Sequence, residues 1–120
     1  MQKIVGDRLR PAGRNDSFGV EQATAQLNRS YAMLEMQVRS KSCAMGEPFT
    51  LVDCAAAPAL FYANTIVPLG AKHPNTRAYL ARLMMRPSFA RVLEEARPYF
   101  DLFPMERKPQ ITSPLRAANQ

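Results

Sequence analysis

The most constraining feature of this sequence is residues 51–66, an apolar segment that follows Thr50 and contains a single charged residue, Asp53. Alanines and large apolar side chains fill most other positions, which predicts a helix without a polar face. Such a helix is stable in water only when other helices surround it, so we expect it to be fully enclosed. Pro58 removes one backbone hydrogen bond and should bend the helix near its middle.

The start of this helix carries a specific capping signature. Thr50 at the N-cap is expected to accept a hydrogen bond from the backbone N–H of Asp53, and the Asp53 carboxylate to accept one from the N–H of Thr50. Phe49 and Cys54 flank this capping box at positions where they would touch as a hydrophobic staple. Asp53 also invites a catalytic interpretation, but the cap already satisfies its carboxylate, so the structural role is favoured.

Hydrophobic periodicity predicts further helices before and after this segment, and no strand signal competes with them. Residues 1–10 are helical without an N-cap in front, and a long helix over 17–39 follows. Helices beginning near Pro74 and Ser88 come later, the last of them ended or kinked by Pro98. The long helix has one apolar seam, which consists of Val20, Thr24, Leu27, Tyr31, Leu34 and Val38. The fold class is therefore all-α, a helical bundle.

The chain length fits one domain, which we place at residues 1–103. Residues 104–120 contain three prolines and little hydrophobic pattern, so they are predicted to form an irregular C-terminal tail. The longest apolar stretch, 51–69, is too short and too interrupted to cross a bilayer, and no membrane association is expected.

The net charge of +6, from 16 basic and 10 acidic residues, permits two interpretations. One is a nucleic-acid-binding surface, and the other is a solvated basic surface. The basic residues are spread along the chain without a run of five or six, and no aromatic residues interleave with them. This pattern favours the solvated surface, so no nucleic-acid partner is expected.

Cys43 and Cys54 are the only cysteines, and His73 is the only histidine. No signal peptide precedes them, and their spacing matches no metal site, so we expect reduced thiols in a cytoplasmic protein that binds no metal. Either cysteine could be a nucleophile. Cys54 lies in a first helical turn but would be buried by the staple, and Cys43 is expected to be exposed in a loop. Incidental thiols are favoured, and no catalytic residue is assigned.

Three segments in series resemble the C-terminal domain of cytosolic glutathione transferases. Residues 46–55 resemble the capping-box segment that opens the buried sixth helix of that family, and 57–63 resemble its continuation in the bacterial branch. Residues 79–83, followed by 86–89, resemble the seventh helix and the start of the eighth. The resemblance spans roughly residues 1–103.

This resemblance implies a helical domain that, in complete relatives, follows a thioredoxin-like domain. That domain binds glutathione, the co-substrate, and supplies the residue that activates its thiol. The present sequence contains no βαβ pattern for it, so we expect this chain alone to be non-catalytic and to hold no cofactor. The family's pocket position implies substrate-binding roles for Ile4, Val5, Arg8 and Tyr62, although apolar residues at helical spacing more often simply pack.

Three functions remain open at this point. The first is the electrophile-site and scaffold domain of a glutathione transferase whose complete form conjugates glutathione to electrophiles. The second is a free-standing helical protein–protein interaction module, and the third, DNA binding, rests on charge alone. Loss of a partner domain would expose the apolar face carrying Ile4, Val5 and Leu9, so we also expect a homo-oligomer.

Overall fold

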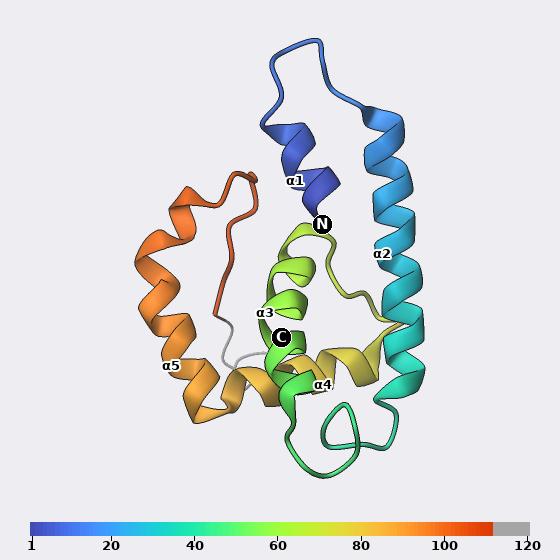
Figure 1. The fold of residues 1–120 in the computed structure, drawn as a ribbon, viewed down its shortest axis with the longest axis vertical. Coiled ribbons are helices and arrows are strands. Elements are labelled where there is room, and N and C mark those ends of the chain that lie inside the picture. Colours follow the sequence, from blue (N-terminus) through green and yellow to red (C-terminus); the bar gives the residue numbers. More distant parts are fainter. Residues whose placement is uncertain (112–120) are drawn as a thin grey trace.

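The computed structural model describes residues 1–111, which form α-helices joined by loops (Figure 1). The elements in chain order are α1 (Gln2–Arg8), α2 (Ser17–Gln37), α3 (Leu51–Ile66), α4 (Pro74–Met85), α5 (Pro87–Ala96) and the 3-10 helix η1 (Arg97–Leu102). No strand forms within the described range, where an isolated bridge joins Cys43 to Gly46 in the loop after α2. The all-α fold class predicted from the sequence is confirmed.

The helices are arranged around α3, which stands at the centre of the view in Figure 1. The long helix α2 runs along one side of the molecule and α5 along the other, while α4 crosses near the N-terminal end of α3. Helix α1 packs against α2, and α4 contacts α2, α3 and α5 in turn. The short helix α4 therefore joins the other helices into one body.

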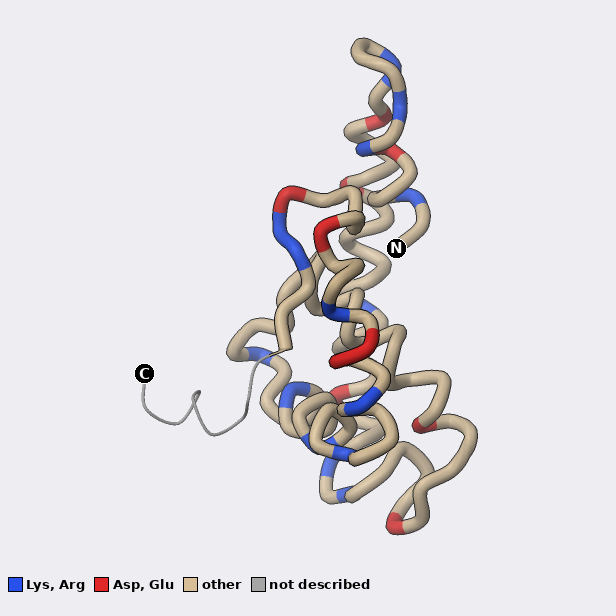
Figure 2. The backbone as a smooth tube through the Cα atoms, turned by 90° about the vertical axis from the view of Figure 1, so that its left-hand side faces the viewer, with Lys and Arg blue, Asp and Glu red and all other residues tan. Residues whose placement is uncertain are grey.

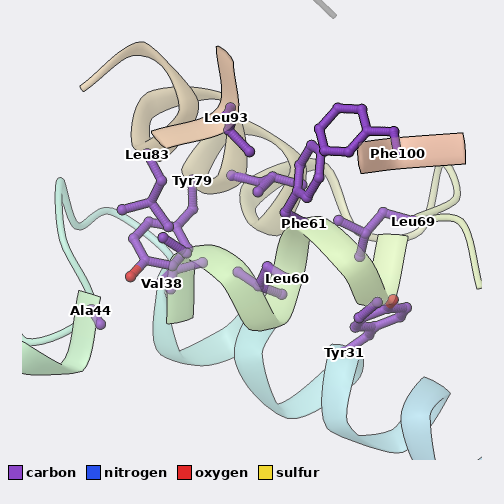
Figure 3. Close-up of a cluster of buried hydrophobic side chains, with 13 residues drawn as sticks. Tyr31, Val38, Ala44, Leu60, Phe61, Leu69, Tyr79, Leu83, Leu93 and Phe100 are labelled. Carbon is purple, nitrogen blue, oxygen red and sulfur yellow. The ribbon is translucent and has the colours of Figure 1, made fainter. Parts of the chain in front are cut away.

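The core lies where α3 meets α2, α4 and α5 (Figure 3). The ring of Phe61 on α3 lies 5.8 Å from the ring of Phe100 and 6.5 Å, edge-on, from that of Phe89. Tyr31 is buried, and its hydroxyl donates a hydrogen bond of 2.8 Å to the carbonyl of Val67. Burial of aromatic and aliphatic side chains of this size is the main stabilising contribution to such a fold.

Helix α2 forms as its sequence predicts. Asp16 is the N-cap, and its side chain accepts a hydrogen bond of 2.9 Å from the backbone N–H of Gly19. Tyr31 and Val38 of the seam are buried, and the remaining seam residues are half-buried. The seam faces the core, while Met33 and Met36 point to solvent, 74% and 81% exposed.

The expectation that residues 51–66 are fully enclosed is wrong for one side of α3. Asp53, Ala57, Leu60, Phe61 and Ala63 are buried. Another side is exposed, and its residues, called here the open face of α3, are Leu51, Val52, Cys54, Ala55, Pro58 and Ala59. The reason is that the helices pack against the opposite side of α3, and nothing in residues 1–111 covers this one.

The predicted apolar patch on residues 1–10 is also corrected by the structure. Ile4 is only 8% exposed, and Val5 is half-buried, because α1 packs against α2. Of the three residues in that patch, only Leu9 is strongly exposed, at 68%. Helix α1 therefore presents no exposed apolar patch of its own, in contrast to the open face of α3.

After η1 the chain turns back along the helical body. Helix α5 ends at Ala96, just before Pro98, as the sequence predicts. Residues 104–111 contain no helix, and Lys108 Nζ holds their turn by donating to the carbonyls of Asp101 (3.1 Å) and Phe103 (2.6 Å). Pro109 is buried, so this part of the predicted tail belongs to the packed body. The remainder of that tail, residues 112–120, lies outside the described range.

Candidate functional site

The carboxylate of Asp53 is the most highly connected polar group at the start of α3. Its Oδ2 accepts a hydrogen bond of 2.9 Å from the backbone N–H of Thr50, and its Oδ1 accepts one of 2.9 Å from the N–H of Ala44. Oδ1 also accepts a hydrogen bond of 2.5 Å from the hydroxyl of Tyr79 on α4. The Thr50 hydroxyl accepts from the N–H of Val52 (3.3 Å), and both halves of a capping box are present.

These contacts decide what Asp53 can do chemically. Burial raises the pKa of its carboxyl, but the hydrogen bonds from Ala44, Tyr79 and Thr50 outweigh that effect and leave the pKa below its ordinary value. Burial and the bond to Asp53 both raise the pKa of the Tyr79 hydroxyl. At neutral pH Asp53 is therefore a carboxylate and Tyr79 a neutral phenol. Because Asp53 is fully buried and both of its oxygens already accept hydrogen bonds, its role is structural.

The predicted staple between Phe49 and Cys54 does not bury the cysteine. Cys54 is exposed, because it lies on the open face of α3. Phe49 is half-buried, and the guanidinium carbon of Arg86 lies 3.5 Å above the centre of its ring. The ring therefore makes a cation–π contact with the α4–α5 junction at the position where a staple was expected.

The other thiol is also placed differently from expectation. Cys43 is half-buried rather than exposed, and both cysteines are free thiols. Within residues 1–111, no three His, Cys, Asp or Glu side chains come together as a metal-binding group.

The four residues predicted to bind substrate do not gather in one cavity. Ile4 is buried and Val5 half-buried on α1, which packs against α2. Arg8 is exposed and forms an ion pair of 2.6 Å with Glu106, which lies in residues 104–111, called here the returning segment. Tyr62 is the member that borders a hollow. Its ring stacks on that of Phe103, with the ring centres 5.5 Å apart.

The hollow beside Tyr62 is an apolar concavity of about 360 Å³ between α3, the end of α5, η1 and the returning segment. We call it the aromatic hollow; its lining residues are Tyr62, Ala96, Tyr99, Phe100, Leu102, Phe103, Pro104 and Pro109. None of them is charged, and Tyr99 and Leu102 at its edge are 66% and 78% exposed. A concavity of this size and lining suits an uncharged apolar or aromatic group.

Sequence reasoning missed one carboxylate with a clear role. Glu35 on α2 accepts hydrogen bonds from the backbone N–H groups of Asn75 and Thr76, both at 2.8 Å, at the first turn of α4. Burial raises the pKa of Glu35, but these bonds and those from the two side chains lower it overall. No local pattern identifies this partner, because Glu35 looks like an ordinary solvent-facing residue of α2.

Charged side chains form no single-sign surface along the described backbone. Figure 2 shows Lys and Arg on segments from one end of the molecule to the other, with Asp and Glu between them. No helix within residues 1–111 is both long and apolar enough to cross a bilayer.

Together these features define a helical domain around the central helix α3. Asp53 in the first turn of α3 has a structural role, and an apolar hollow lies beside Tyr62 near the other end of the helix. The chain belongs to the glutathione S-transferase family, C-terminal domain, whose family model matches residues 8–87. The match covers the whole of α2, α3 and α4, so it includes the capping box and the start of the α4–α5 junction. Comparisons with curated proteins and with solved structures gave no significant match.

Proposed function

We propose that this chain is the electrophile-site and scaffold part of a glutathione transferase and acts together with a thioredoxin-like domain that binds glutathione. The observation that carries this proposal is the family match over residues 8–87. In the complete enzyme the chain would help to hold an electrophilic substrate, to which glutathione is conjugated. The glutathione transferase branch proposed here is the bacterial one, on the resemblance of residues 57–63.

The aromatic hollow supports the substrate side of this proposal. It is uncharged, it is large enough for one aromatic ring with substituents, and Tyr62 forms part of its wall. Ile4, Val5 and Arg8 belong to the proposed electrophile site through their family position, and Arg8 would have to leave Glu106 to contact a substrate. Tyr62 is therefore the residue on which the test concentrates.

The Asp53 carboxylate already accepts hydrogen bonds from Thr50, Ala44 and Tyr79, which supports a chain that is non-catalytic alone. We therefore propose that glutathione enters as co-substrate on the partner domain, and that this chain needs no cofactor. Two free cysteines are compatible with a reducing, cytoplasmic location, which belongs to the same proposal.

The test is equilibrium dialysis of the purified chain with a chlorodinitrobenzene, combined with a conjugation assay in the presence of glutathione. We expect saturable binding, a several-fold loss of affinity in Tyr62→Ala, and no conjugation above the spontaneous rate. Met33→Ala, a change at an exposed apolar residue of α2, is the matched control and should bind as the unchanged chain does. Absence of binding would contradict the electrophile role, and turnover by the chain alone would contradict the non-catalytic role.

A further inference from the structure

A polar concavity, called here the basic recess, lies between the end of α2, the loop that follows it and α4. Its volume is about 360 Å³, and its lining residues are Val38, Ser40, Lys41, Ser42, Asn75, Ala78 and Arg82. Two of these side chains are cations, and no Asp or Glu of the described chain lines the recess. None of its lining residues borders the aromatic hollow, so the proposed electrophile site is separate from it.

Arg82 on α4 is anchored at the wall of the recess by the backbone of the loop. Its Nε donates a hydrogen bond of 3.1 Å to the carbonyl of Ser42, and its Nη2 donates one of 2.9 Å to the carbonyl of Lys41. The guanidinium carbon also lies 5.9 Å from the centre of the Tyr79 ring. A guanidinium has further N–H donors, and the two bonds to the loop leave those on Nη1 for a ligand. The guanidinium is therefore oriented before any ligand binds.

Lys41 supplies the second positive charge from the loop. It is half-buried, and its carbonyl is one of the two that hold Arg82, so the backbone bonds bring both cations to the same recess. Within residues 1–111, no carboxylate lies at ion-pair distance from either Lys41 or Arg82. Two cations that share a concavity without an acidic partner attract an anion into it.

Two acidic residues hydrogen-bond to residues of the recess without lining it. Glu35 accepts hydrogen bonds from the backbone N–H groups of Asn75 and Thr76, and Glu47 accepts one of 3.2 Å from the hydroxyl of Ser42. Because Glu35 already accepts from these two N–H groups, the positive charge of the recess comes from its two cations rather than from the N-terminus of α4.

We propose that the basic recess binds the phosphate group of a small anion, either inorganic phosphate or a phosphate monoester. The paired N–H donors of a guanidinium match the spacing of phosphate oxygens, and the ammonium group of Lys41 adds a point charge. The hydroxyl of Ser40, another lining residue, adds a neutral donor. Donors from three side chains exceed what the two oxygens of a carboxylate accept and suit the three terminal oxygens of a phosphate monoester.

A bound phosphate would join the loop after α2 to α4. Lys41 belongs to that loop and Arg82 to α4, and the same loop contains Ala44, whose N–H donates to Asp53. The ligand would therefore add a second restraint on a loop that is already tied to the start of α3. Because the recess is open to solvent, water and salt screen its charges, and we expect a Kd on the order of millimolar.

Titration of the nitrogen-15-labelled chain with inorganic phosphate, followed by NMR at constant pH and ionic strength, tests the proposal. We expect saturable shifts of the amide signals of residues 40–42, 78 and 82, and none around the aromatic hollow. Glycerol 3-phosphate is the second ligand, and acetate, expected to bind about tenfold more weakly, is the third. Tighter binding of glycerol 3-phosphate would identify a monoester as the ligand, and the reverse order would identify free phosphate. Equal binding of acetate, or no saturation with either phosphate compound, overturns the proposal.

Two variants test whether the recess is the binding site. Lys41→Gln should weaken phosphate binding about fivefold, while Lys3→Gln, which removes the same charge from an exposed residue of α1, should not. Ala78→Glu places a carboxylate one helical turn before Arg82, where it pairs with the guanidinium and repels phosphate. Ala78 is exposed, so this variant should keep its melting temperature and lose phosphate binding, and Ala32→Glu on α2 is its control. Unchanged affinity in Lys41→Gln or in Ala78→Glu overturns the assignment of the site.

Discussion

Glu35 on α2 caps the first turn of α4 through Thr76, whose backbone N–H and hydroxyl both donate to Oε2, at 2.8 and 2.7 Å. The other oxygen, Oε1, accepts from the backbone and the side chain of Asn75, at 2.8 and 2.7 Å. The N-cap of α4, His73, makes no side-chain capping bond of its own. The first N–H groups of α4 are thus satisfied by a carboxylate from another helix, which fixes where α4 docks on α2.

Replacing this carboxylate by an amide tests its role as a distant cap. Glu35→Gln keeps the size of the side chain but gives up the charge at the N-terminus of α4 and turns one acceptor into a donor. We expect a loss of about 1–2 kcal/mol in the free energy of unfolding, measured by urea denaturation. Glu21→Gln on the exposed side of α2 is the control and should change stability by less than about 0.5 kcal/mol. Equal effects of the two substitutions would contradict the capping role.

Asp53→Asn should be more damaging than Glu35→Gln. The amide nitrogen would face donors that now point at a fully buried carboxylate, leaving at least one of them without an acceptor. We expect a loss of about 2–4 kcal/mol, and about 1–2 kcal/mol for Tyr79→Phe, which removes one donor only. Combining the two should cost less than the sum, because the bond between them is counted in both single variants. Additive losses would show that the two groups are not coupled.

The same two carboxylates predict how stability depends on pH. The pKa of Asp53 lies below its ordinary value of 3.8 and that of Glu35 below 4.5, so each is stabilising in its charged form. This contribution is complete above the unfolded-state pKa values and is lost as the pH falls through the folded-state values. The melting temperature should therefore be insensitive to these groups near pH 6 and fall steeply below about pH 4.

Variants separate the two contributions to this acid sensitivity. Glu35→Gln should flatten the decrease in melting temperature between about pH 4.5 and pH 3, because one group that takes up a proton on unfolding is gone. Glu21→Gln should leave the profile unchanged. An unaltered profile in Glu35→Gln would mean that other carboxylates control acid unfolding.

A hydrophobic staple would have buried the Cys54 thiol and protected it from reagents, whereas the observed exposure of Cys54 predicts that it is reactive. Cys54 should react with a thiol reagent in the folded protein without denaturant, and the half-buried Cys43 should react more slowly. Cys54→Ser should change the free energy of unfolding by less than about 0.5 kcal/mol. Phe49→Ala should cost more than that, since the Phe49 ring lies under Arg86. Slow labelling of both thiols would contradict the exposed position of Cys54.

Much of the fold could be predicted because its signals are local. The 3.6-residue period of the seam predicts a helix over 17–39, close to the observed α2 at Ser17–Gln37, and the Thr50–Asp53 pair predicts the start of α3. Pro74 and Pro98 mark the start of α4 and the end of α5 for the same reason, since proline acts within one helical turn. Local steric and hydrogen-bonding rules are enough for all of these boundaries.

The errors concern which side of each helix other elements cover. The composition of α3 correctly indicates that it needs neighbours, but not that its partners within residues 1–111 lie on one side. For the same reason the apolar patch was expected on α1, where Ile4 is in fact buried against α2. Glu35 was missed because the residues that it caps, Asn75 and Thr76, are separated from it in the sequence by the whole of α3. Coverage and distant capping depend on tertiary packing, which a periodic pattern does not encode.

The carboxylate of Asp53 also joins two segments that would otherwise move separately. The N–H of Ala44 belongs to the loop after α2, and the N–H of Thr50 belongs to the start of α3, yet both donate to the same side chain. Neither of these hydrogen bonds can break without disturbing the Asp53 carboxylate, which also accepts the other one. In native-state hydrogen exchange the two protons should therefore open together, as one cooperative unit with the Tyr79 region of α4, even though a loop amide such as that of Ala44 would ordinarily exchange early.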